Sequence, residues 1–202
     1  MGGLTVWRHP KPVGAEGRCI GRTDVQVDRR KSKRLAHRIR AWARRHGAAN
    51  EVITSPLRRG ADVGRWLARW GWRHRIDVRL IEVNFGLWDG RAWDAIGAVA
   101  VDTWCGDFAQ HRPGGGEPVA ALLARCAAFI AEAHRDSVHL GSGGEAWVCV
   151  VGHAGWISAA LWLQQAGPAM PEPGSWPAAV GYGARVLIGL PGLPAMVGAP
   201  AG

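Results

Sequence analysis

The run 147–151, Trp-Val-Cys-Val-Val, limits the folds open to this chain more than any other feature of its sequence. Five apolar residues in succession, with no polar residue at alternate positions, are typical of a strand that is covered on both faces. Such a strand lies inside a sheet that has helices on each side. The run therefore favours an α/β fold with a mostly parallel sheet.

Shorter apolar segments alternate with helical segments along the rest of the chain. Strands are expected at 4–7, 51–54, 77–80 and 184–190, and helices at 29–46, 55–70, 117–135 and 155–165. Ser55 and Pro56 are typical of a helix N-cap and of a first helical residue. The alternation predicts a three-layer α/β/α sandwich with a mostly parallel central sheet.

Length and composition agree with a single domain. The chain has 202 residues, of which 48% are hydrophobic, so it can bury a substantial core and is too apolar to be intrinsically disordered. We expect the domain to occupy residues 1–190. The Pro- and Gly-rich segment 191–202 is expected to be a flexible C-terminal tail.

Signals for membranes, export and metals are missing from the sequence. No apolar stretch reaches the roughly eighteen residues of a membrane span, and the first residues lack the basic region of a signal peptide. The four cysteines are scattered without C-x-x-C spacing, which indicates reduced thiols and neither a disulfide frame nor a zinc site. We therefore expect a soluble, cytoplasmic protein without a membrane partner or a metal.

The net charge of +9 originates in one segment. Residues 29–45 contain nine basic residues and no acidic one, and the rest of the chain is neutral. Leu35, Ile39 and Trp42 recur at helical spacing, which predicts an amphipathic helix with a basic outer face. This face could bind nucleic acid or an anionic membrane. We favour the alternative of a solvated helix face, because no recognised nucleic-acid-binding motif accompanies it.

Charged and nucleophilic side chains gather at the predicted strand ends, where ligands bind in sheets of this type. They are Arg8 and His9 after the first strand, Arg58 and Arg59 after the second, Glu82 after the third, and His153 after the run 147–151. Arginine presents a fork of donors that matches phosphate oxygens. A neutral histidine can attack phosphorus, and a carboxylate can carry the proton to the leaving oxygen. The set predicts phosphate chemistry.

Five segments resemble the motifs of one family. Residues 4–9 end in an R-H pair, and 54–59 contain S-P-L-x-R. Residues 80–90 resemble L-x-E-x-x-F-G-x-W-E-G, 113–117 resemble P-G-G-E, and 150–155 resemble V-x-H-G-G. In this order, over residues 4–165, they resemble the histidine phosphatases, the superfamily of cofactor-dependent phosphoglycerate mutases. The resemblance implies that the domain 1–190 has a phosphoglycerate mutase-like fold.

The resemblance also implies a role for each residue at the strand ends. His9 would be the nucleophile that becomes phosphohistidine, and Glu82 would be the proton donor and then the base. Arg8, Arg59 and His153 would hold the phosphoryl group, with His153 also counted as catalytic. No cofactor is implied, since two arginines and two histidines can supply much of the stabilisation that phosphoryl transfer needs.

The chain departs from the family pattern at positions beside both histidines. Pro10 stands where a small Gly or Ala is common, and it removes a backbone N–H from the loop. Ala154 stands where Gly is common. Neither departure removes a charged catalytic group, so activity is still expected.

The loop 17–25 is similar to the G-x-C-Y-G-x-x-D-V loop of alpha-ribazole phosphatases, which act late in cobalamin assembly. Ile20 stands in place of the usual Tyr, and the likeness implies that Gly21 and Arg22 contact the substrate. Only residues 91–112 separate the acid-bearing block from the P-G-G-E turn, so the insertion normal in the mutases is missing. A short lid suits hydrolysis, because a mutase must keep water from its phosphohistidine.

We therefore expect a phosphatase for a small-molecule phosphomonoester, with alpha-ribazole 5′-phosphate as one candidate. The alternatives are a broad-specificity sugar or nucleotide phosphatase and a phosphoglycerate mutase. A hypothesis of another class is a non-catalytic protein that grips an anionic polymer with helix 29–46, and the complete set of catalytic positions argues against it. The oligomeric state stays open, a homodimer being one alternative.

Overall fold

The computed structural model describes residues 3–139 and 147–189, in which five strands form one sheet. The strands are β1 (Gly3–Arg8), β2 (Glu51–Thr54), β3 (Arg73–Ile76), β4 (Trp147–Gly152) and β5 (Arg185–Gly189). Their order across the sheet is β3-β2-β4-β1-β5, with β5 antiparallel to β1 and the other neighbours parallel. The sheet is mostly parallel, as expected.

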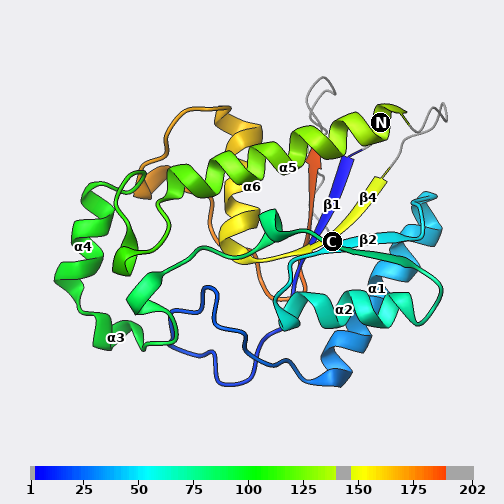
Figure 1. The fold of residues 1–202 in the computed structure, drawn as a ribbon, viewed down its shortest axis with the longest axis horizontal. Coiled ribbons are helices and arrows are strands. Elements are labelled where there is room, and N and C mark those ends of the chain that lie inside the picture. Colours follow the sequence, from blue (N-terminus) through cyan, green and yellow to red (C-terminus); the bar gives the residue numbers. More distant parts are fainter. Residues whose placement is uncertain (1–2, 140–146, 190–202) are drawn as a thin grey trace, which may run out of the picture.

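Helices cover both faces of the sheet (Figure 1). Helices α1 (Arg29–His46) and α2 (Arg58–Ala68) lie on one face, and α5 (Val119–His139) and α6 (Ala154–Ala166) on the other. Cys149 and Val151 of β4 pack into the core on the α1–α2 side, whereas Val150 packs with α5 and α6. Because successive strand residues point to opposite faces, both cores need apolar residues from this one strand. The three-layer sandwich predicted from the sequence is confirmed (Figure 1).

The basic helix begins and ends as the sequence predicts. The Asp28 side chain accepts a hydrogen bond from the backbone at the start of α1, and Gly47, with a φ of +64°, ends the helix. Leu35, Ile39 and Trp42 are buried, which leaves the basic side chains on the outer face. No helix among the residues that the structure describes is long and apolar enough to cross a membrane.

The expected strand 77–80 is wrong. The third strand is β3, and Val78–Leu80 form a 3₁₀ helix that the Asp77 side chain caps by accepting from the Arg79 backbone N–H at 2.8 Å. Strand β3 is an edge strand of sequence Arg-His-Arg-Ile with no buried residue. It therefore lacks the apolar pattern by which a strand is recognised.

The predicted start of the second helix is also wrong. Helix α2 begins at Arg58, after an N-cap at Leu57 that makes no side-chain hydrogen bond. Ser55 and Pro56 lie in the connection before it, and Ser55 has another partner, described below. The expected tail, 191–202, lies outside the described residues.

Two short helices that the sequence analysis did not anticipate lie within 91–112. They are α3 (Trp93–Ile96) and α4 (Ala98–Gly106), which lie together at one end of the molecule (Figure 1). Aromatic contacts attach them to the block 80–90: the ring of Phe85 meets Trp93 and Trp104 edge-on at 6.0 and 5.9 Å. The segment is therefore a compact, packed connection.

Candidate active site

The adjacent strands β1 and β4 bring two histidines together. The backbone N–H of His9 donates to the carbonyl of Gly152, the last residue of β4, at 3.1 Å. His153 follows Gly152 directly in the sequence. The centroids of the two imidazole rings lie 4.9 Å apart. Both side chains are buried, His9 being 4% exposed. The expectation that parallel strand ends gather these residues agrees with this geometry.

The hydrogen bond of His9 defines its tautomer. Its Nδ1 lies 2.8 Å from the Pro10 carbonyl oxygen, which can only accept, so Nδ1 carries the proton and Nε2 carries the lone pair. Burial, and then the charge of Arg59, lowers the pKa of His9 to about 3. Near neutral pH the ring is therefore uncharged, and the Nε2 lone pair is available. Pro10 removes a backbone N–H but keeps the carbonyl on which this arrangement depends.

His153 is held through both ring nitrogens. The Arg59 Nε–H donates to its Nδ1 at 3.1 Å, so the proton lies on Nε2, which is 2.6 Å from the Ser55 hydroxyl oxygen. Burial, and then the charge of Arg59, holds the pKa of His153 well below its ordinary value. Ser55 was expected to cap a helix; instead its side chain orients this imidazole. The S-P-L-x-R motif contains the Ser, but sequence alone did not assign it this partner.

Arg59 reaches the centre from the first turn of α2. Arg59 is only 1% exposed. Besides its hydrogen bond to His153, its guanidinium donates to the carbonyl oxygens of Thr23 at 2.8 Å and Gly21 at 2.5 Å. A guanidinium has five N–H groups, so two remain for a ligand. Arg58, by contrast, is exposed, and its backbone N–H donates to Asp24 at 2.7 Å.

Arg8 lies against an aromatic residue that the sequence analysis missed. The carbon at the centre of its guanidinium lies 3.8 Å from the centroid of the Tyr182 ring, and that ring lies 5.6 Å from the ring of His9. One terminal N–H of Arg8 donates to the Val180 carbonyl at 2.5 Å, while its buried Nε has no hydrogen-bond partner. Tyr182 comes from a Gly-rich connection that matches no motif, so no sequence signal pointed to it.

Glu82 is buried and held by backbone donors. Its carboxylate accepts from the N–H of Val83 at 3.0 Å and from that of Gly155, in the first turn of α6, at 3.2 Å. A Cβ on residue 155 would lie 2.6 Å from the carboxylate, so a glycine is needed there. Burial lowers the pKa of both Arg8 and Arg59, and the charge of Glu82 opposes that lowering. When it is ionised, Glu82 therefore favours the charged form of both arginines.

The loop that carries Gly21 and Arg22 is shaped by Asp89. This carboxylate accepts from the backbone N–H groups of Gly21, Arg22 and Thr23 at 3.0, 2.5 and 3.2 Å. The Gly21 carbonyl is occupied by Arg59, and the exposed Arg22 side chain lies 3.5 Å from Glu117. Gly21 thus positions Arg59, whereas Arg22 is accessible to a ligand.

A family model agrees with the motifs over most of the chain. The model described as "Histidine phosphatase superfamily (branch 1)" matches residues 4–174. The chain belongs to this superfamily. The inferred resemblance and the assignment as a phosphatase enzyme are confirmed.

Solved structures of similar fold extend this result. A mycobacterial glucosyl-3-phosphoglycerate phosphatase is 25% identical, with a TM-score of 0.70 over 92% of this chain and 88% of its own. An alpha-ribazole phosphatase from Shigella flexneri is 22% identical, with a TM-score of 0.67 over 90% of this chain and 87% of its own. A phosphoglycerate mutase from Thermus thermophilus is 22% identical, with a TM-score of 0.63 over 93% of both chains. No curated protein matches the chain.

The site of this histidine phosphatase can bind and polarise a phosphoryl group with its own side chains. The buried Arg59 and the half-buried Arg8 supply positive charge, and an uncharged imidazole with a free lone pair lies beside them. Among the described residues there is no group of three or more His, Cys, Asp and Glu side chains placed to hold a metal ion.

Proposed function

We propose that this histidine phosphatase hydrolyses small phosphomonoesters through a phosphohistidine on His9, with Arg8, Arg59 and His153 binding the phosphoryl group. The observation that carries the proposal is the hydrogen bond between Nδ1 of His9 and the Pro10 carbonyl. It leaves the Nε2 lone pair available, while burial and the charges of Arg59 and Arg8 lower the pKa of His9 and keep the ring uncharged. Because the His9 ring stays uncharged, it keeps its nucleophilic lone pair beside the two guanidinium groups that bind the phosphoryl group.

In the first step Nε2 of His9 forms a bond to phosphorus while the ester P–O bond breaks. Protonated Glu82 gives its proton to the departing oxygen, so the alcohol leaves neutral. Charge on the phosphoryl oxygens is stabilised by Arg59, which has two uncommitted N–H groups, and by Arg8, whose buried Nε lacks a partner. The phosphorylated ring is positively charged, and the Pro10 carbonyl stabilises that charge through Nδ1–H.

In the second step water attacks the phosphorus of the phosphohistidine. Glu82, now ionised, accepts a proton from the water, the P–N bond breaks and inorganic phosphate leaves. His153 stays uncharged and orients the phosphoryl group with Nε2–H, which exchanges its contact with Ser55 for a phosphoryl oxygen, while Arg59 keeps Nδ1 occupied. The cycle returns every residue to its starting state without a metal in any step.

Hydrolysis is favoured over mutase chemistry by the short segment 91–112, since a mutase has to exclude water from the intermediate. Alpha-ribazole 5′-phosphate is the first candidate substrate, supported by the likeness of the loop 17–25 and by the accessible Arg22. Glucosyl-3-phosphoglycerate is the second, supported by the 25% identity to a phosphatase of that name. A broad-specificity sugar or nucleotide phosphatase is the alternative to both.

The test is hydrolysis of p-nitrophenyl phosphate in the presence of EDTA by the wild type and by His9→Ala. We expect turnover in the wild type, none in the variant, and an acid-labile phosphoprotein trapped from labelled substrate in the wild type alone. Residual turnover in a folded His9→Ala protein would contradict the mechanism, and so would loss of wild-type activity in EDTA. A panel containing both candidate phosphoesters and 3-phosphoglycerate then ranks the leaving groups by kcat/KM.

A further inference from the structure

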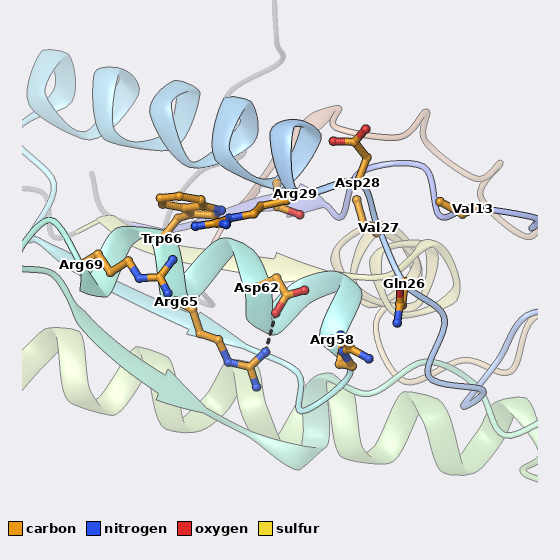
Figure 2. Close-up of a pocket in the computed structure, with 11 residues that line it drawn as sticks. Val13, Gln26, Val27, Asp28, Arg29, Arg58, Asp62, Arg65, Trp66 and Arg69 are labelled. Atoms are coloured by element: carbon orange, nitrogen blue, oxygen red, sulfur yellow. Dashed lines mark hydrogen bonds and ion pairs between the residues drawn. The ribbon is translucent and has the colours of Figure 1, made fainter.

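A cavity lies outside the centre around His9. It has a volume of about 620 Å³, within the range of small-molecule sites. Its walls are the loop before α1, the first turn of α1 and the outer side of α2 (Figure 2). The arginines on these walls are Arg29, Arg58, Arg65 and Arg69.

The cavity has more positive than negative charge. Its two carboxylates are Asp62, which pairs with Arg65, and Asp28, whose side chain caps the backbone of α1 (Figure 2). Among the described residues no carboxylate lies within ion-pair distance of the other three guanidinium groups, those of Arg29, Arg58 and Arg69. A ligand that matched this wall would carry at least two negative charges.

An indole holds two of these arginines in place. The guanidinium carbons of Arg29 and Arg69 lie 5.0 and 4.9 Å from the centroid of a ring of Trp66. A cation above an aromatic face is attracted by it, and a stacked guanidinium keeps the N–H donors along its edge available. The two donors are thus oriented before any ligand arrives, which reduces the entropy lost on binding.

Ser32 supplies an independent sign of a missing partner. It lines the cavity from the first turn of α1, is 1% exposed, and its hydroxyl has no hydrogen-bond partner. Buried hydroxyl groups almost always have a partner, because burial without one costs free energy. A polar group of a ligand bound in the cavity would provide this partner once the side chains that cover the Ser32 oxygen moved aside.

The cavity is separate from the catalytic centre although the two are neighbours. Arg58 lines the cavity, whereas Arg59, the next residue, points to His153. One loop joins the two sites: the Thr23 carbonyl accepts from Arg59, and the Asp24 carboxylate accepts from the backbone N–H of Arg58. The cavity is therefore not the site at which the ester bond breaks.

We propose that this cavity is a binding site for a small molecule with a multiply charged phosphate group. Arg29, Arg58 and Arg69 bind its phosphate oxygens, for which a guanidinium fork is the matching donor. Ser32 hydrogen-bonds to a polar atom at the floor. A small molecule fits better than an anionic polymer, because the arginines line a cavity of about 620 Å³ and not a flat basic face.

Inorganic pyrophosphate is the probe, titrated by calorimetry at physiological salt into the wild type and Arg59→Ala, which disables the catalytic centre. We expect binding to persist in Arg59→Ala and to weaken tenfold or more when Arg29→Gln and Arg69→Gln are added. The matched control is Arg44→Gln with Arg45→Gln, two exposed arginines at the far end of α1, which should change affinity less than threefold.

Two further measurements locate the bound probe. The indole N–H resonance of Trp66, assigned by its loss in Trp66→Phe, should shift on titration with pyrophosphate. Ser32→Ala should weaken binding without lowering thermal stability, since the hydroxyl has no partner in the free protein. Unchanged affinity of Ser32→Ala for pyrophosphate would show that the Ser32 hydroxyl does not contact the ligand.

Three results would overturn the proposal. Pyrophosphate binding that disappears in Arg59→Ala would belong to the catalytic centre alone. Equal weakening by the cavity pair and the control pair would indicate general attraction to the basic face of α1, as an anionic polymer would experience. Absence of binding in both the wild type and Arg59→Ala would exclude the site. None of these readouts uses turnover, so they are independent of the phosphatase mechanism.

Discussion

The Nε–H of Arg59 donates to Nδ1 of His153 across 3.1 Å and so joins the first turn of α2 to the end of β4. This contact orients the guanidinium and selects the tautomer of the imidazole at once. Because both groups are buried, neither can turn toward water as an alternative. The two groups that we propose bind the phosphoryl group are therefore arranged before a substrate arrives, which is the condition for electrostatic stabilisation of a transition state.

Arg59→Ala should cost far more activity than Arg58→Ala. The first change removes buried donors beside His153, and the second removes an exposed side chain that faces the neighbouring cavity. We expect a loss in kcat of roughly two or more orders of magnitude for Arg59→Ala, the scale seen when one oxyanion donor is removed. Steady-state kinetics with p-nitrophenyl phosphate checks this, and equal losses would mean that Arg58 also reaches the phosphoryl group.

Glu82→Gln should affect substrates according to their leaving groups. A ribose alkoxide needs a proton as the P–O bond breaks, so we expect phosphohistidine formation from a ribose phosphate to slow by roughly 10²- to 10⁴-fold. p-Nitrophenolate leaves almost unaided, and its burst phase should slow much less. Rapid-quench measurement separates this step from dephosphorylation, in which Glu82 also acts. Equal burst-phase losses would limit Glu82 to positioning phosphate, with His153 the next candidate donor.

His9 should make the fold sensitive to acid. Its pKa is about 3 in the native state against an ordinary 6.5, so between these values the unfolded chain binds a proton that the native state does not. Stability is complete above 6.5 and falls as the pH drops toward 3. The fall in Tm between about pH 7.5 and about pH 5 should thus be smaller for His9→Gln than for the wild type. An equal fall in Tm for the wild type and His9→Gln would show that His9 is not the source of the acid sensitivity.

The far end of the basic helix should be dispensable for catalysis. Trp42 packs on Trp147, the first residue of β4, at 5.7 Å, so Arg44 and Arg45 lie near the opposite end of that strand from His153. Six strand residues span roughly 17 Å, about two Debye lengths at physiological salt. Arg44→Glu with Arg45→Glu should therefore change kcat/KM for p-nitrophenyl phosphate by less than about threefold at about 0.15 M salt.

Arg38, on the same helix, provides the contrast to that pair. Its guanidinium lies 5.3 Å from a ring of Trp7 and 3.2 Å from where a Cβ on Gly183 would be, next to Tyr182. Arg38→Glu should therefore lower kcat/KM more than the Arg44–Arg45 double change. A comparable drop for both, abolished by salt, would instead indicate steering of the substrate by the whole basic face.

Local sequence determined which residues meet at the centre. Apolar runs identify β1 and β4, and residues that follow parallel strands share one edge of the sheet, so His9 and His153 could be placed together. The same reasoning failed at Glu82. Its expected strand is a 3₁₀ helix, while the true strand β3 is too polar to be recognised. The motif nevertheless identified the residue, because a motif does not depend on the element that carries it.

Tertiary structure alone decided how those residues are used. The tautomer of His153 follows from Ser55 and Arg59, which are 98 and 94 residues from it in the chain. Tyr182 reaches Arg8 from the far end of the described chain, and the arginine cavity needs α1 and α2 side by side. Strand and helix patterns record which face of a local element is apolar, whereas hydrogen bonds and cavities depend on what the folded chain places opposite that face.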